Sequence, residues 1–105
     1  MKSINVTELK SWMDSGKQFK LIDVREPLEY QTGHINGVSI PMGEVLQRIS
    51  EIPADEDVVI HCKSGGRSGS VCNYLETELG YSNLYNLEGG IMAWKNTIDP
   101  SIDVL

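Results

Sequence analysis

Short apolar runs alternate with segments of helical periodicity along almost the whole chain, and this alternation strongly constrains the fold. The runs at residues 19–24, 38–40, 58–61 and 84–87 have the length and composition of buried strands. Strands that alternate with helices are typical of a parallel sheet with helices on both faces. We therefore expect an α/β fold with a parallel sheet at its centre.

The segments between these runs carry the start and stop signals of helices. Asn5 and Glu8 form a capping pair before a first helix, and Gly16 ends that helix. Pro27 suits the first turn of a short second helix, which runs through Tyr30. Apolar residues and glycine stops predict further helices at residues 42–49, 67–79 and 91–94.

The length and composition fit one compact domain. The chain has 105 residues, of which 40% are hydrophobic, so it can build one modest core and leaves no room for a second domain. We assign residues 1–105 to a single domain. Residues 98–105 are a candidate for a loosely attached C-terminal tail. The oligomeric state is left open.

The charge balance excludes some partners. Fifteen acidic and nine basic residues give a net charge of -6, which argues against nucleic acid or an anionic membrane as the main partner. A small anionic substrate must therefore be attracted by a local positive site. The first residues lack the apolar core of a signal peptide, and no later run is long enough to span a bilayer, so we expect a cytoplasmic protein.

The cysteines and histidines do not form a structural framework. Two cysteines are too few for a disulfide scaffold, and two cysteines with two histidines lack the spacing of metal ligands. We expect no metal and no cofactor. Cys72 shares a helix face with Leu75 and Leu79, which predicts a packing role.

The stretch from His61 to Ser68 carries the chemistry. Cys62 ends the most strand-like run, and Lys63 and Arg67 bring two positive charges into a glycine-rich turn that leads into a helix. A helix N-terminus and the inward-facing amides of a tight turn favour an anion, so this setting stabilises a thiolate, the nucleophilic form of cysteine. His61 precedes Cys62 on a strand, so their side chains point to opposite faces and a catalytic Cys-His pair is not expected.

The length of the cysteine loop, residues 62–68, separates two chemistries. Phosphatase loops place five residues between cysteine and arginine, whereas four separate Cys62 from Arg67. A shorter ring of amides is smaller and suits one additional sulfur atom better than a phosphoryl group. Phosphatase activity is therefore the least favoured reading.

The chain resembles the rhodanese-type sulfurtransferases. Their Cys-x-x-Gly-x-Arg-Ser loop matches residues 62–68, and their N- and C-terminal signatures are similar to residues 23–25, 29–30, 33–37 and 87–94. The resemblance covers about Ile4 to Lys95. Mild departures are Val38, where the family usually has alanine, and Val71 and Cys72, where small residues are common.

The resemblance implies a five-stranded parallel sheet, with helices on both faces, and a persulfide on Cys62. A sulfane sulfur would pass from thiosulfate or a similar small anionic donor to a thiophilic acceptor, cyanide or a thiol. Lys63 and Arg67 would bind the donor. The remaining substrate-binding residues of the loop would be Ser64, Gly65, Gly66 and Ser68.

Two alternatives stay open. The same Cys62 could serve a persulfide relay that passes sulfur between partner proteins, and a protein would then be the sulfur acceptor. The third reading is a non-catalytic rhodanese-like binding module, which an intact cysteine loop disfavours.

Other polar residues are interpreted as scaffold. Arg25 and Glu29 lie four apart across a helix start and are expected to form a local pair, with Asp23 beside them. His34 is expected to tie its own turn to the backbone. Trp94 is expected to pack in the core beneath the cysteine loop.

Overall fold

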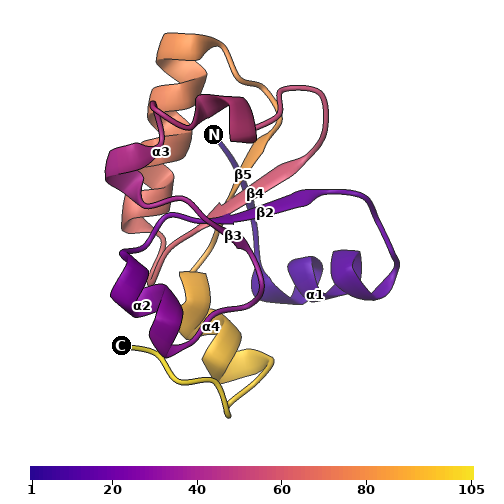
Figure 1. Ribbon diagram of the computed structural model, residues 1–105. Helices are drawn as coiled ribbons and strands as arrows, with labels where there is room; N and C mark the ends of the chain where they lie inside the picture. The colour runs from indigo at the N-terminus through magenta and orange to yellow at the C-terminus, as the bar shows by residue number, and fades with distance from the viewer.

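A five-stranded parallel sheet forms the centre of the computed structural model, which describes residues 1–105 (Figure 1). Its strands are β1 (Lys2–Ile4), β2 (Lys20–Asp23), β3 (Val38–Ser39), β4 (Val58–His61) and β5 (Leu84–Leu87). The order across the sheet is β1-β5-β4-β2-β3, and all neighbouring strands are parallel. This confirms the predicted α/β fold.

The helices form a layer on each face of the sheet. They are α1 (Val6–Asp14), α2 (Pro27–Thr32), α3 (Gly66–Leu79) and α4 (Gly90–Thr97). In Figure 1, α1 and α4 lie on one side of the strands and α3 lies on the other. The pattern of β4 explains why both faces are covered. Successive side chains of a strand point to opposite faces, and all four residues of β4 are buried.

Two apolar clusters fill the space between the sheet and its helices. Val58 and Ile60 of β4 point into the cluster beneath α3, which also contains Cys62 and Cys72. Val59 points into the other cluster, with Leu9 of α1 and Trp94 of α4. Each fully buried aliphatic side chain contributes roughly 1.5–3 kcal/mol to folding. Because its side chains alternate between the two faces, β4 contributes buried apolar contacts to both helix layers.

The helix starts follow from local hydrogen bonds. The Glu8 amide donates to the Asn5 side chain at 2.8 Å, and the Asn5 amide donates to the Glu8 carboxylate at 3.1 Å. This is the capping box that the sequence predicted. Pro27 is the first residue of α2, as expected from its fixed φ angle.

The structure differs from the sequence predictions at two elements. β1 pairs with β5 at the edge of the sheet, although its three residues carried no strand pattern. The helix predicted at residues 42–49 was wrong. Two 3₁₀ turns, η1 (Met42–Glu44) and η2 (Ile49–Glu51), occupy this region. Buried residues three or four apart are compatible with either structure, so the apolar spacing did not distinguish them.

The C-terminal residues pack onto the rest of the molecule. Ile98, Ile102 and Val104 contact the apolar cluster beneath α1 and α4, and the ammonium group of Lys95 donates to the Ile102 carbonyl. The Asp103 backbone lies directly against Gly33. These contacts attach the segment that the sequence suggested as a loose tail. No helix of the structure has the length and apolarity needed to cross a membrane.

Candidate active site

Cys62 follows β4 directly, at the carboxyl end of the sheet. Its side chain is 1% exposed, and its sulfur accepts hydrogen bonds from the amides of Gly65, at 3.2 Å, and Ser68, at 3.4 Å. The Ser68 hydroxyl lies 3.3 Å from the same sulfur. Ligands of parallel α/β sheets bind at this edge, beside helix N-termini, so Cys62 lies where a ligand would be expected.

The loop makes the Cys62 thiol more acidic. Burial disfavours the thiolate, but hydrogen bonds from the hydroxyl and amide of Ser68 and from the amides of Gly65 and Ser64 outweigh burial and lower the pKa of Cys62. A lowered pKa raises the thiolate fraction at neutral pH. The hydrogen bonds of the loop therefore favour the thiolate form of Cys62, while its role as a nucleophile stays a prediction.

The path of the loop depends on Gly65. Its φ of +107° lies in a region that residues with side chains rarely adopt, and it turns the chain into α3. The first amides of a helix have no acceptor within the helix. Because α3 begins at Gly66, the amides of Gly66 and Arg67 are available to an anion held in the loop.

The N-terminus of α4 is hydrogen-bonded to the backbone of the cysteine loop. The Ile91 amide donates to the Cys62 carbonyl and the Met92 amide donates to the Lys63 carbonyl, both at 3.0 Å. A Cβ atom on Gly90 would lie 2.5 Å from both carbonyl oxygens. Only glycine at this position lets α4 hold the backbone of Cys62 so closely.

Of the two cations predicted to bind a donor, Lys63 is exposed at the surface of the loop. Arg67 is already paired: its guanidinium donates to both carboxylate oxygens of Glu29, at 2.7 and 3.0 Å. This pair, with a hydrogen bond from the Glu26 amide, lowers the pKa of Glu29 to about 2 despite partial burial. Arg67 therefore ties α3 to α2 as well as carrying charge near the sulfur.

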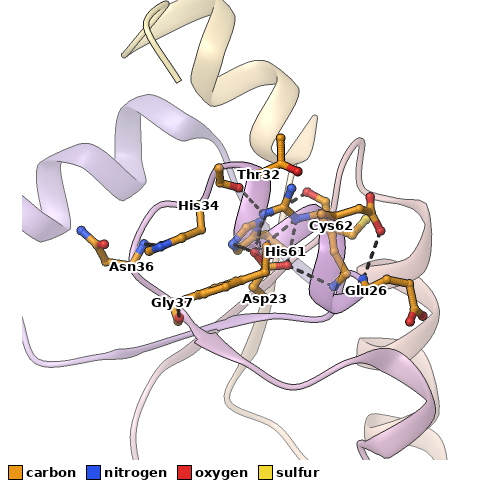
Figure 2. Close-up of polar contacts among 12 residues, drawn as sticks. Asp23, Glu26, Thr32, His34, Asn36, Gly37, His61 and Cys62 are labelled. Atoms are coloured by element: carbon orange, nitrogen blue, oxygen red, sulfur yellow. Dashed lines mark hydrogen bonds and ion pairs between the residues drawn. The ribbon is translucent and has the colours of Figure 1, made fainter. Parts of the chain in front are cut away.

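A buried polar cluster lies on the face of the sheet opposite the Cys62 side chain. The Arg25 guanidinium donates to Asp23 at 2.7 Å and to the Gly33 carbonyl at 2.8 Å. The predicted Arg25–Glu29 pair was therefore wrong. His61 lies beside Asp23, with 3.5 Å between its Nε2 and a carboxylate oxygen (Figure 2).

His61 does not face the sulfur of Cys62, as predicted from strand geometry. Its Nδ1 lies 3.3 Å from the Cys62 carbonyl oxygen. Burial is the main cause that lowers the pKa of His61, and it favours the neutral form of the ring. Its position indicates a structural role in holding the strand end.

Comparison with known proteins agrees with this geometry. A sequence profile described as "Rhodanese-like domain" matches residues 5–97, which is most of the chain. The chain belongs to the rhodanese-like domain family. A crystal structure of a rhodanese-like domain protein from Staphylococcus aureus superposes with a TM-score of 0.85 at 34% identity, covering 100% of this chain and 99% of the other.

Two relatives of this rhodanese-like domain have names that indicate sulfur transfer. "Sulfurtransferase" of Allochromatium vinosum is 48% identical over 75 residues, covering 70% of this chain and 69% of the relative. "Probable adenylyltransferase/sulfurtransferase MoeZ" of Mycobacterium tuberculosis is 33% identical over 103 residues, 95% of this chain but only 26% of the relative. The chain thus spans about a quarter of the length of MoeZ.

The remaining predictions for this rhodanese-like domain concern residues around the loop. Cys72 is fully buried in the apolar cluster, and burial raises its pKa to about 12, which agrees with a packing role. His34 accepts a hydrogen bond from the Asn36 amide at 3.0 Å and stacks on Tyr30. Trp94 is buried in the core.

Two residues that contact the cysteine loop were not predicted from the sequence. Glu29 was interpreted as local scaffold, but it binds Arg67, 38 residues away. Asn86 was not singled out, although its amide group contacts Ser68 and Gly65. Its place on β5, next to the strand that ends at Cys62, was the one available signal.

Proposed function

We propose that this rhodanese-like domain is a sulfurtransferase that moves a sulfane sulfur from thiosulfate, or a similar small anionic donor, to a thiophilic acceptor through a Cys62 persulfide. The observation that carries the proposal is the buried Cys62 sulfur, which accepts hydrogen bonds from the amides of Gly65 and Ser68 at the N-terminus of α3. These donors are fixed before any substrate binds. They stabilise negative charge on sulfur at no cost in reorganisation during the reaction.

The reaction has two displacement steps. The Cys62 thiolate attacks the outer sulfur of thiosulfate, the sulfur–sulfur bond of the donor breaks, and sulfite leaves with the electron pair. The product is a persulfide on Cys62. Cyanide or a thiolate then attacks the outer sulfur of this persulfide, and Cys62 leaves as the thiolate.

The residues of the loop have separate roles in this scheme. The unpaired first-turn amides of Gly66 and Arg67 hold the outer sulfur of the persulfide, while Gly65 and Ser68 hold the inner one. Lys63, exposed at the surface of the loop, attracts the anionic donor. The hydroxyl of Ser64 adds a polar group at the same exposed surface. A reducing compartment such as the cytoplasm suits the free thiol of Cys62.

The pairing of Arg67 favours a second candidate function, a persulfide relay between proteins. A guanidinium that already binds Glu29 through both terminal nitrogens has less charge to offer a dianion such as thiosulfate. A protein persulfide carries less charge and depends less on Arg67. The relay would use the same Cys62 and the same loop amides, with another protein as sulfur acceptor.

The sulfurtransferase proposal is tested by the mass of the protein after incubation with thiosulfate. We expect a gain of one sulfur atom on Cys62, with an equal amount of sulfite released. Cys62→Ser should give neither, and Cys72→Ala should behave as the wild type because Cys72 lies in the apolar core. A protein that gains no sulfur from thiosulfate or from a small-molecule persulfide would overturn sulfurtransferase activity at Cys62.

The role of Arg67 in choosing the donor is tested with Glu29→Gln. If the pair limits thiosulfate use, this variant should raise kcat/KM for thiosulfate several-fold and leave transfer from a small-molecule persulfide nearly unchanged. Glu26→Gln is the matched control, because it removes an exposed carboxylate near Arg67 that does not bind the guanidinium. Equal effects of the two substitutions would show that net charge, and not the pair, sets thiosulfate use.

A further inference from the structure

The hydroxyl of Ser68 lies between two hydrogen-bond partners. Ser68 is fully buried, and its oxygen lies 3.3 Å from the Cys62 sulfur and 2.5 Å from the side-chain oxygen of Asn86. The three residues come from separate places: Cys62 follows β4, Ser68 belongs to the first turn of α3, and Asn86 lies on β5. The hydroxyl therefore connects the reacting sulfur to a neighbouring strand.

The orientation of the Asn86 amide is fixed by a second contact. Its nitrogen donates to the Gly65 carbonyl at 3.2 Å, so its oxygen faces Ser68. A carbonyl oxygen accepts hydrogen bonds only, and a hydroxyl has a single proton to donate. When the Ser68 proton is donated to Asn86, the Ser68 oxygen can only accept from Cys62.

The two protonation states of Cys62 therefore need different positions of this proton. A neutral thiol can donate to the Ser68 oxygen while Ser68 donates to Asn86, so all three groups are satisfied. A thiolate accepts only, and it needs the Ser68 proton for itself. The oxygens of Ser68 and Asn86, 2.5 Å apart, would then face each other without a proton between them.

We propose that Asn86 is a positioning residue that competes with the Cys62 thiolate for the Ser68 proton and so limits how acidic Cys62 becomes. The proton turns toward Cys62 when the thiolate forms. It returns to Asn86 when the sulfur is capped by a second sulfur, because the negative charge then lies on the outer atom. This inference rests on the proposed function only in taking Cys62 as the reacting sulfur.

The other charged and titratable groups around Cys62 do not depend on Asn86. Arg67 and Cys72 on α3 interact with the sulfur through charge, and Lys63 lies next to it in the loop. On the other side of the sheet, His61 contacts the Cys62 backbone beside the paired Asp23 and Arg25. β5 contributes the neutral Asn86, and α4 contributes backbone amides. A change in Cys62 acidity caused by a neutral substitution at Asn86 therefore acts through its two contacts, the Ser68 hydroxyl and the Gly65 carbonyl. A background without the Ser68 hydroxyl separates the two.

The experiment measures the pH dependence of Cys62 alkylation by iodoacetamide in a Cys72→Ala background, which leaves one thiol. Leucine is close to asparagine in size and cannot accept a hydrogen bond. Asn86→Leu should therefore lower the midpoint of the pH profile and raise the alkylation rate at about pH 6 by roughly three- to tenfold. Ser68→Ala should raise the midpoint. Asn86→Asp should also raise it, because a carboxylate accepts the Ser68 hydrogen bond more strongly and its negative charge disfavours the thiolate.

The decisive control is the double variant Ser68→Ala with Asn86→Leu. If Asn86 acts through the Ser68 proton, Asn86→Leu should have no effect on the midpoint once Ser68 is alanine. The same shift in both backgrounds, or no shift in either, would overturn the proposal. Should Asn86→Leu fail to fold, Asn86→Asp replaces it in both backgrounds, and an equal rise of the midpoint with and without the Ser68 hydroxyl would overturn the proposal, because charge alone would then explain the rise. Alkylation needs no sulfur donor, so the result is independent of whether thiosulfate is a substrate.

Discussion

The guanidinium of Arg67 binds the carboxylate of Glu29 through two hydrogen bonds, at 2.7 and 3.0 Å, and so ties the start of α3 to α2. The side chains of Arg67 and Glu29 are 36% and 14% exposed, so water screens part of their attraction. The contact is nevertheless the one ion pair between the cysteine loop and another element of the fold.

Glu29→Gln should reduce the loss of folding stability that occurs when the pH is lowered from about 4.5 to about 2. The pKa of Glu29 falls from 4.5 to about 2 on folding, so its stabilising contribution is complete above about pH 4.5 and is lost as the pH falls through about 2. We expect Glu29→Gln to cost about 1 kcal/mol at pH 7, after allowance for solvent screening. Urea unfolding at a series of pH values should show the difference from wild type shrinking in that window. Glu44→Gln, at an exposed contact of 3.4 Å, is the control; a cost that stays constant down to about pH 2 would contradict the assignment.

Gly90→Ala should disrupt the support of the loop. The added Cβ would lie 2.5 Å from the carbonyl oxygens of Cys62 and Lys63, and the φ of +56° disfavours any side chain. We expect a loss of about 2–3 kcal/mol in the free energy of unfolding, together with slower alkylation of Cys62. Gly43→Ala is the matched control, because its Cβ would meet open space and should change stability by less than about 0.5 kcal/mol. Similar urea midpoints for the two variants would show that α4 can move away from the loop at little cost.

Arg25→Leu should be among the most destabilising single changes in the molecule. It leaves the carboxylate of Asp23, which is 1% exposed, without its partner. Breaking a buried ion pair from one side costs about 3–5 kcal/mol. The same substitution at Arg48, which pairs with Glu51 at the surface, should cost no more than about 1 kcal/mol. Denaturant unfolding compares the two, and equal costs would indicate that Asp23 takes up a proton when Arg25 is removed.

The two cysteines should react very differently in the folded protein. Hydrogen bonds lower the pKa of Cys62, whereas burial raises that of Cys72 to about 12. Iodoacetamide at about pH 8 should therefore add one group to the native protein, on Cys62, and two groups after denaturation. Peptide mass mapping locates the adducts. Modification of Cys72 under native conditions at a comparable rate would mean that α3 opens readily.

Local patterns predicted the central elements of the fold well. β4 and β5 have the predicted bounds because their apolar runs are bracketed by clear turn residues. β1 was not predicted, since three residues with two exposed polar side chains show no period, and only pairing with β5 makes them a strand. The 3₁₀ turns η1 and η2 were missed because the spacing of Val45, Ile49 and Ile52 fits more than one helical geometry.

The residues of the cysteine loop were predicted from the sequence, but their contacts with other elements of the fold were not. Contacts among residues 62–68 are local, so the count of residues between Cys62 and Arg67 was informative by itself. The partners supplied by other elements, Glu29 and Asn86, depend on how the strands and helices are assembled. Polar residues occur in many short strands, and no local rule identifies Asn86 as a neighbour of the Cys62 sulfur.

The outermost strands of the sheet are its shortest, with three residues in β1 and two in β3. An exposed strand edge is a template on which another chain can add a strand, and the hazard grows with the length of the unpaired row. These two edges offer few free backbone groups in a row. The consequence is a smaller template for strand addition, which disfavours aggregation of the domain through its sheet edges.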